Sequence, residues 1–128
     1  GYNRLYEFEN GSFTPVSSNF GSNIDVLELD PIDTDIIYVA INSNLYKSTD
    51  HGVNFTNLGS FPNYITSIEV NNNNNNIVYV TTRGTAGNVY QSLDQASSFS
   101  DISGNLPAVV KNVIKKGKSK EKKSLVNT

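Results

Sequence analysis

The sequence lacks several residues on which common functional sites depend. Among its 128 residues there is no cysteine and no methionine, and His51 is the single histidine. Without cysteine, the chain can build neither a disulfide framework nor a thiolate nucleophile or metal site. One histidine excludes a histidine-rich metal cage and a histidine-based catalytic triad formed by this chain alone. The sequence therefore predicts no metal site and no cofactor.

Two further absences concern the membrane and processing. No apolar run approaches the roughly 18 residues of a membrane-spanning helix, so the sequence predicts no membrane span. Because the chain begins at Gly1 without an initiator methionine, we expect a processed product or a piece excised from a longer protein.

Charge is distributed unevenly along the chain. From Lys111 onward there are seven lysines against one acidic residue, whereas residues 1–110 hold three basic residues against eleven acidic ones. Like charge and low hydrophobicity favour a disordered C-terminal tail. The tail lacks the interleaved aromatic residues of single-stranded nucleic-acid binders, so nucleic acid is not an expected partner. A truncated end, or a basic arm that contacts the acidic body, explains the tail equally well.

The chain contains an internal repeat. Several landmarks recur in the same order at spacings of 41 to 45 residues. They are Ile24-x-x-Leu27-x-Leu29 with Ile65-x-x-Ile68-x-Val70, Ile36–Val39 with Ile77–Val80, Leu45–Asp50 with Val89–Asp94, Phe55 with Phe99, and Phe61-Pro62 with Leu106-Pro107. This order indicates two copies of one structural unit.

Each copy reads as four β-strands. The runs at Ile36–Ile41 and Ile77–Thr82 are short, rich in β-branched and aromatic residues, and bounded by turn-forming residues. No stretch before residue 108 shows a helical apolar period. The first strand changes phase after Ile24 and after Ile65, which predicts a β-bulge at both places. Four strands per 41–45 residues are typical of a β-propeller blade.

We therefore expect an all-β chain of propeller blades that is not a closed ring by itself. Residues 1–20 are expected to form the last two strands of a preceding blade, and residues 21–62 and 63–107 two complete four-stranded antiparallel blades. Residues 108–128 are expected to begin a further blade and run into the basic tail. Open ends leave apolar faces in water, so further blades or self-association must close the ring.

One turn carries a known pattern. Residues Ser48, Asp50, Gly52 and Phe55 fit Ser/Thr-x-Asp-x-Gly-x-x-aromatic, and the segment resembles the Asp-box, also called the BNR repeat. The Asp side chain can accept backbone N–H groups that the turn leaves unpaired. The glycine allows a positive φ, and the aromatic ring anchors the hairpin in the core.

A second turn keeps part of this pattern. Ser92, Asp94 and Phe99 are retained, but Ala96 stands in place of the glycine, so we expect a loop that is strained or differently shaped. The Asp-box occurs in sialidases, xyloglucan hydrolases, sortilin-type receptors and other secreted repeat proteins. The resemblance implies that the box residues are structural and remote from any catalytic centre. It also implies an extracellular or cell-surface protein.

Acidic residues give weaker candidates for chemistry. The resemblance to sialidases implies an arginine triad, which this chain with Arg4 and Arg83 does not supply. Glycosidases use two carboxylates, and acids lie near the first strand at Asp25, Glu28, Asp33 and Asp35, although solvated turns explain them as well. Asp30, Asp33 and Asp35 lack the glycine and glutamate of an EF-hand calcium loop.

Tyr64 and Arg83 are the candidates for ligand contact. Tyr64 lies at the entry of a blade's first strand, where its ring can stack on a sugar, and Arg83 begins the longer turn of the second blade. The sequence favours a non-catalytic binding or scaffold module that presents loops to a glycan or a protein. The alternative is a fragment of a secreted glycoside hydrolase of sialidase or xyloglucan-hydrolase type.

Overall fold

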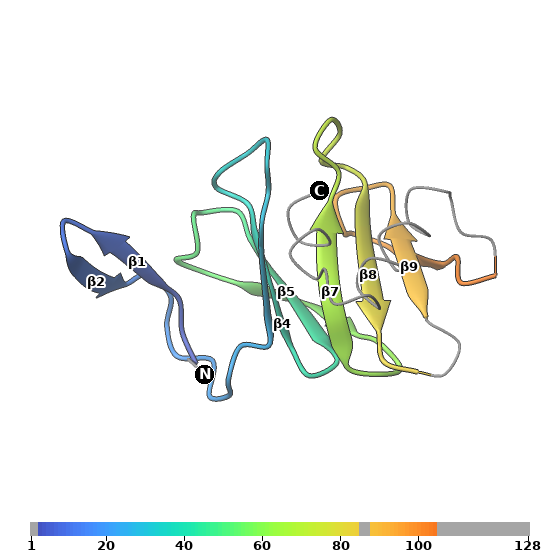
Figure 1. Ribbon diagram of the computed structural model, residues 1–128, viewed down its shortest axis with the longest axis horizontal. Helices are drawn as coiled ribbons and strands as arrows, with labels where there is room; N and C mark the ends of the chain where they lie inside the picture. The colour runs from blue at the N-terminus through green and yellow to red at the C-terminus, as the bar shows by residue number, and fades with distance from the viewer. Residues whose placement is uncertain (1–2, 85–87, 105–128) are drawn as a thin grey trace.

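The computed structural model of the protein describes residues 3–84 and 88–104. The described residues form ten β-strands and no helix, and every strand pairing is antiparallel. A two-stranded hairpin, a first four-stranded sheet and a second four-stranded sheet follow one another along the long axis of the molecule (Figure 1). The prediction of an all-β chain with four-stranded antiparallel sheets is confirmed, and the described part forms an open arrangement.

The N-terminal hairpin consists of β1 (Tyr6–Glu9) and β2 (Ser12–Pro15). Asn10 and Gly11 form its two-residue turn with φ of 52° and 78°. Positive φ at both positions is the requirement of a type I′ turn, whose twist matches that of the flanking strands. The Asn-Gly sequence therefore sets the register of the hairpin.

The first sheet has its strands in sequence order. They are β3 (Val26–Leu29), β4 (Ile37–Ile41), β5 (Asn44–Ser48) and β6 (Thr56–Ser60). All five residues of β4 are buried, because both faces of this strand are covered. A continuous run of branched apolar residues is what such a strand requires.

The second sheet repeats this order. Its strands are β7 (Ile65–Val70), β8 (Val78–Thr82), β9 (Val89–Ser92) and β10 (Ser100–Asp101). The register of β7 on β8 shifts between Ile65 and Ser67, where the sequence predicts a bulge. In the first sheet β3 begins only at Val26, so Ile24 lies before the strand, and the pairing of β3 with β4 is regular.

The turn between the first two strands is built in the same way in both sheets. Asp30 Oδ1 accepts hydrogen bonds from the N–H groups two and three residues later, at 2.8 and 2.9 Å. Asn71 Oδ1 accepts the corresponding bonds at 2.8 and 3.0 Å. The asparagine run Asn71–Asn76 thus forms a turn of the same kind as Asp30–Asp35.

Aromatic clusters repeat as well. Phe20 packs edge-on against Tyr46 and Phe55, with ring centroids 5.6 and 5.2 Å apart. Phe61 packs in the same manner against Tyr90 and Phe99, at 4.9 and 5.3 Å. In each cluster, one ring comes from the segment before a sheet and two come from that sheet's third and fourth strands or the turn between them.

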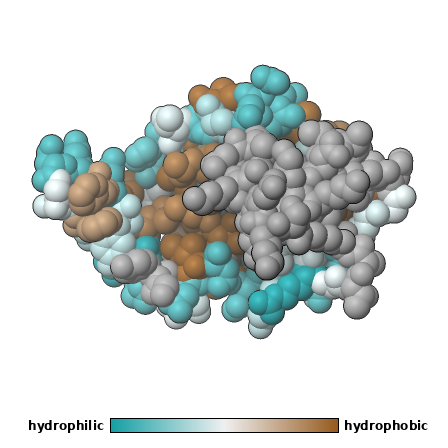
Figure 2. Space-filling model, viewed as in Figure 1, coloured by the Kyte–Doolittle hydropathy of each residue, from teal (hydrophilic) through white to brown (hydrophobic). Residues whose placement is uncertain are grey.

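The main core lies between the two sheets. Tyr38, Ala40 and Leu45 of the first sheet are buried in one cluster with Ile68 and Val80 of the second. Strands β3 and β7, the first strands of the two sheets, are neighbours in this packing. The opposite face of the first sheet packs against the segment that carries the hairpin, and apolar side chains gather over this part of the molecule (Figure 2).

Lys47 links the two sheets. From β5 its ammonium group donates hydrogen bonds to the Gln95 carbonyl at 2.8 Å and to Gln95 Oε1 at 3.0 Å. Burial lowers the pKa of Lys47, while nearby Asp30 and Asp94 oppose that effect. The division of the chain at residues 20, 62 and 107 stays a prediction. The predicted further blade and basic tail at 108–128 lie outside the described residues.

Candidate functional site

The first Ser-x-Asp turn is organised around two side chains. The Ser48 hydroxyl donates to Asp50 Oδ1 at 2.8 Å and accepts the N–H groups of Asp50 and Gly52 at 3.2 and 2.8 Å. The Asp50 carboxylate also accepts the backbone N–H and the side-chain amide of Asn54, both at 2.9 Å. Together these two side chains satisfy donors that the turn backbone leaves unpaired.

The second turn has the same hydrogen bonds. Ser92 Oγ donates to Asp94 Oδ1 at 2.8 Å and accepts the N–H of Ala96 at 2.8 Å. Ser98 donates to Asp94 through its N–H at 2.9 Å and through its hydroxyl at 2.6 Å. Ala96 has a φ of 71° where Gly52 has 90°. The alanine therefore keeps the hydrogen bonds of the loop and adopts a backbone conformation that is strained for a residue with a side chain.

Hydrogen bonding holds both aspartates in the charged state. The N–H of Asn54 is the largest cause that lowers the pKa of Asp50 to about 2, and the hydroxyl of Ser98 is the largest for Asp94, also at about 2. Phe55 and Phe99 pack in the two aromatic clusters described above. The carboxylates of the two turns are thus occupied by their own loops, which leaves them little capacity for an external ligand.

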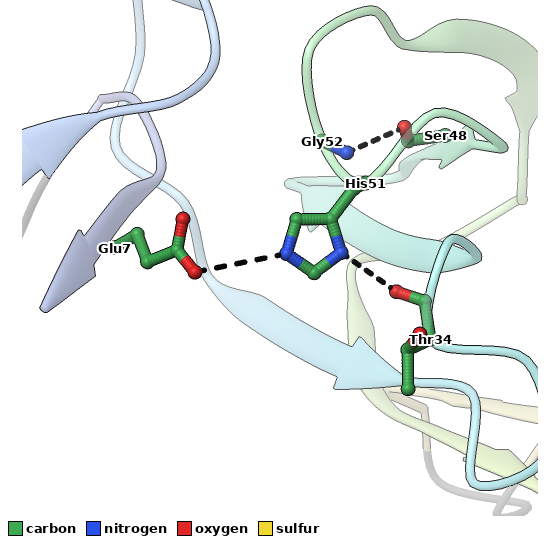
Figure 3. A network of polar contacts seen from close by, with 5 residues as sticks. All are labelled: Glu7, Thr34, Ser48, His51 and Gly52. Atoms are coloured by element: carbon green, nitrogen blue, oxygen red, sulfur yellow. Dashed lines mark hydrogen bonds and ion pairs between the residues drawn. The ribbon is translucent and has the colours of Figure 1, made fainter. Parts of the chain in front are cut away.

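His51 connects the first turn to the hairpin. Its Nδ1 lies 2.9 Å from the Thr34 carbonyl oxygen, and its Nε2 lies 3.9 Å from Glu7 Oε1 (Figure 3). The ring thus spans the space between β1 and the loop before β4. His51 stands at a variable position of the Ser-x-Asp pattern, so the pattern does not predict these two contacts.

Tyr64 and Arg83 lie together. The Arg83 guanidinium sits over the Tyr64 ring, 5.1 Å from its centroid, and the Arg83 N–H donates to the Tyr64 carbonyl at 2.9 Å. Tyr64 is 48% exposed. No acidic side chain in residues 3–84 and 88–104 forms an ion pair with Arg83. Stacking holds the guanidinium in place, and among the described residues its N–H donors are not taken up by an ion pair.

Glu28 and Glu69 border one groove. They come from β3 and β7, and the groove has a volume of about 410 Å³, with Leu29, Pro31 and Val70 also in its wall. Burial raises the pKa of Glu28 to about 8, and the charge of Glu69 is the next largest cause. The Oε2 atom of Glu28 is buried and has no hydrogen-bond partner among the described residues. The groove therefore places Glu28, a carboxyl group that keeps its proton at neutral pH, near a second acidic side chain, Glu69.

The sequence pointed to Glu28 as a candidate acid but not to Glu69. The signal was present, because Glu69 follows Glu28 by 41 residues, the repeat spacing. Other acidic residues of the first sheet accept hydrogen bonds from backbone N–H groups. Asp25 Oδ2 accepts the N–H of Asn42 at 2.6 Å, and Asp33 Oδ1 accepts the N–H two residues later at 3.0 Å. These carboxylates are not brought together at the groove.

The described residues hold neither a cluster of metal-ligating side chains nor a membrane-spanning helix. Residues 3–84 and 88–104 contain no group of three or more histidine, cysteine or acidic side chains placed to hold a metal ion. They also contain no helix long and apolar enough to span a membrane.

Comparisons with known proteins leave the family open. Neither the models of known protein families nor the sequences of curated proteins give a match to this chain.

Proposed function

We propose that the protein is a non-catalytic binding or scaffold module made of Asp-box β-propeller blades, which presents its loops to a glycan or a protein. The observation that carries the proposal is the repeated unit itself. Two sheets with the strand order of a blade pack with their first strands side by side, and both carry the same hydrogen-bonded Ser-x-Asp turn. Further blades or self-association would close the ring. An extracellular or cell-surface location belongs to the same proposal.

Tyr64 and Arg83 are the proposed ligand contact. An exposed aromatic ring offers a stacking surface, and a positioned guanidinium binds a carboxylate through paired hydrogen bonds. The ligand that best fits both groups is a sugar that carries a carboxylate.

Binding to immobilised acidic and neutral glycans tests this assignment. Acidic glycans should bind more tightly, and Arg83→Ala should weaken their binding by about tenfold or more, as expected for loss of a charged hydrogen bond. Leu93→Ala, an exposed residue on the second turn, is the matched control and should bind as the wild type does. Equal binding by the wild type and Arg83→Ala contradicts the assignment.

The glycoside hydrolase fragment is the second candidate, and one observation favours it. Glu28, with a pKa of about 8, would hold a proton at neutral pH and supply it as a general acid, with Glu69 as the second carboxylate. Release of reducing sugar from sialylated substrates and from xyloglucan tests this reading. Turnover that disappears in Glu28→Gln and in Glu69→Gln supports a hydrolase, and absence of turnover in the wild type rejects it for this chain.

A further inference from the structure

Three hydroxyl groups lie beside the Tyr64–Arg83 contact on the second sheet. The Thr66 hydroxyl lies 2.7 Å from the Thr81 hydroxyl, and the Ser67 hydroxyl also hydrogen-bonds to Thr81. The bulge in β7 explains this grouping, because it inserts Thr66 as an extra residue beside Ser67, the partner of Thr81 on β8. Thr66, Ser67 and Thr81 thus form one hydroxyl cluster.

The hydroxyl cluster and the Arg83 side chain share one face of the sheet. Val80 and Thr82 of β8 are buried, whereas Thr81 between them is partly buried and Arg83 is exposed. Because side chains alternate along a strand, Thr81 and Arg83 point to the same face, with their Cα atoms roughly 6.6 Å apart. The hydrogen bond from the Arg83 N–H to the Tyr64 carbonyl continues the pairing of β8 with β7 to these two residues. A ring, a cation and a group of hydroxyls therefore follow one another on this face.

The hydroxyl cluster keeps hydrogen-bonding capacity for a ligand. Three hydroxyls carry one donor and two acceptor lone pairs each. The two hydrogen bonds within the cluster use two of the three donors and two of the six lone pairs. One donor and four lone pairs remain, and Thr66 is an exposed residue. Sugar hydroxyls, which both donate and accept, match this combination.

The first sheet shows that this place stays accessible when another unit packs beside it. The positions 41 residues before Tyr64, Thr66 and Arg83 hold Asn23, Asp25 and Asn42. All three are exposed, although the second sheet packs against the first. They offer neither a ring nor a cation, and the Asp25 carboxylate accepts the Asn42 N–H at 2.6 Å. A further blade stacked on the second sheet would therefore leave its ring, cation and outermost hydroxyl open to a ligand.

We propose that this place binds a hexuronate residue of an acidic glycan, a pyranose ring that carries a carboxylate and neighbouring hydroxyls. The carboxylate bonds the Arg83 guanidinium, the sugar contacts the exposed part of the Tyr64 ring, and two ring hydroxyls bond the hydroxyl cluster. One ring spans these groups, because they are a single two-residue step apart along the strand. The inference rests on the proposed binding function and names the class of its acidic sugar.

Glu69 sets the orientation of the sugar. It follows Ser67 by two residues on β7, so it lies on the same face, at the end of the hydroxyl cluster away from Arg83. Its charge disfavours a carboxylate at that end, whereas the guanidinium favours one at the other. The carboxylate is therefore placed at Arg83 and the ring hydroxyls toward Glu69.

Titration with small probes, followed by backbone amide chemical shifts, tests the assignment. Methyl α-D-galacturonoside carries the carboxylate and the hydroxyls, methyl α-D-galactoside carries the hydroxyls without the charge, and tetrahydropyran-2-carboxylate carries the charge without the hydroxyls. We expect saturable shifts at Thr66, Thr81 and Arg83 with the galacturonoside, and binding weaker by about fivefold with either other probe, from the loss of about one net hydrogen bond. No saturable shift with the galacturonoside overturns the proposal.

A fourth probe distinguishes hexuronate from sialic acid. The methyl glycoside of N-acetylneuraminate carries a carboxylate but a single ring hydroxyl, so it should bind more weakly than the galacturonoside. Equal or tighter binding of this probe overturns the assignment of a hexuronate.

Two variants separate the hydroxyl cluster from Arg83. Thr66→Val keeps the branched shape that suits a strand and removes the exposed hydroxyl, so galacturonoside binding should weaken by about fivefold. Binding of tetrahydropyran-2-carboxylate should not change. Thr56→Val, at an exposed threonine of β6, is the matched control and should bind both probes as the wild type does. Equal galacturonoside binding by Thr66→Val and the wild type overturns the role of the hydroxyl cluster.

The outcome is separable from that of the proposed function. Equal binding of the galacturonoside and tetrahydropyran-2-carboxylate, lost in Arg83→Ala, overturns the hexuronate and leaves acidic-ligand binding at Arg83 in place. Absence of binding by every acidic probe and by the immobilised acidic glycans removes both.

Discussion

Ala96 shows how much space the two Ser-x-Asp turns leave for a side chain. Gly52 and Ala96 occupy equivalent positions, both at positive φ, and the hydrogen bonds around them are the same. A left-handed conformation costs a residue with a side chain roughly 1–2 kcal/mol. Ala96 is buried between the sheets, and apolar burial of its methyl group offsets part of that cost. The position therefore tolerates alanine only where neighbouring side chains leave space.

This difference gives a matched pair of substitutions. Gly52→Ala should destabilise the protein by about 1–3 kcal/mol, because it adds both backbone strain and a 3.2 Å contact with Leu5. Ala96→Gly should change the free energy of unfolding by less, since relief of strain and loss of the methyl contact oppose each other. Urea unfolding of the three proteins measures both values. A Gly52→Ala protein as stable as the wild type would contradict the close packing at that turn.

The carboxylates of Asp50 and Asp94 make the turns sensitive to acid. Both pKa values lie at about 2 in the folded protein, below the usual 3.8. A depressed carboxyl pKa contributes stability that is present above the unfolded value and is lost as pH falls through the folded value. We therefore expect the free energy of unfolding to fall between about pH 4 and pH 2. Asp50→Asn should lower stability at pH 6 and flatten this decline, whereas Asp35→Asn should preserve it.

At the scale of elements, much of the fold is predictable from local chemistry. Alternating and continuous apolar runs predict the strands, and the Asn-Gly turn predicts the hairpin. The sheet pairing follows from the repeat, because equivalent segments form equivalent strands. What local patterns do not reveal is how side chains from different strands meet. Glu28 and Glu69 lie 41 residues apart in sequence, and their shared groove depends on the packing of β3 beside β7.

Burial of Glu28 in β3 makes the free energy of unfolding fall as pH rises, which is the opposite of the effect of Asp50 and Asp94. Burial raises its pKa from 4.5 to about 8, so the folded protein retains a proton that the unfolded chain releases between these values. Stability from this group is complete below about pH 4.5 and is lost as pH rises through about 8. Glu28→Gln, which is always neutral, should become more stable than the wild type at pH 9. Urea unfolding at pH 6 and pH 9 measures the change, and a difference independent of pH would contradict a buried, protonated Glu28.

At the scale of the whole molecule, the two sheets differ on one pair of equivalent faces. Val26 and Ala40 of the first sheet, which face the second, correspond to Ser67 and Thr81. Hydroxyls of Thr66, Ser67 and Thr81 hydrogen-bond to one another on the second sheet. The second sheet thus carries hydroxyl side chains where the first carries apolar ones. At the other end of the described molecule, the hairpin presents an apolar surface instead.

That apolar surface predicts self-association through the hairpin. Phe8 and Phe13 are 61% and 72% exposed, and their rings contact each other at a tilt of 55°, with centroids 4.8 Å apart. Association would remove these rings from water at roughly 25 cal/mol per Å² of apolar surface. Light scattering during size-exclusion chromatography should give a mass that rises with concentration above the 14.0 kDa of one chain. Replacing both residues, Phe8→Ser with Phe13→Ser, should return the mass to one chain, whereas Leu93→Ser, at another exposed apolar residue, should not. A wild-type protein that stays at one chain's mass at every concentration contradicts ring closure by self-association and leaves further blades as the way to complete the structure.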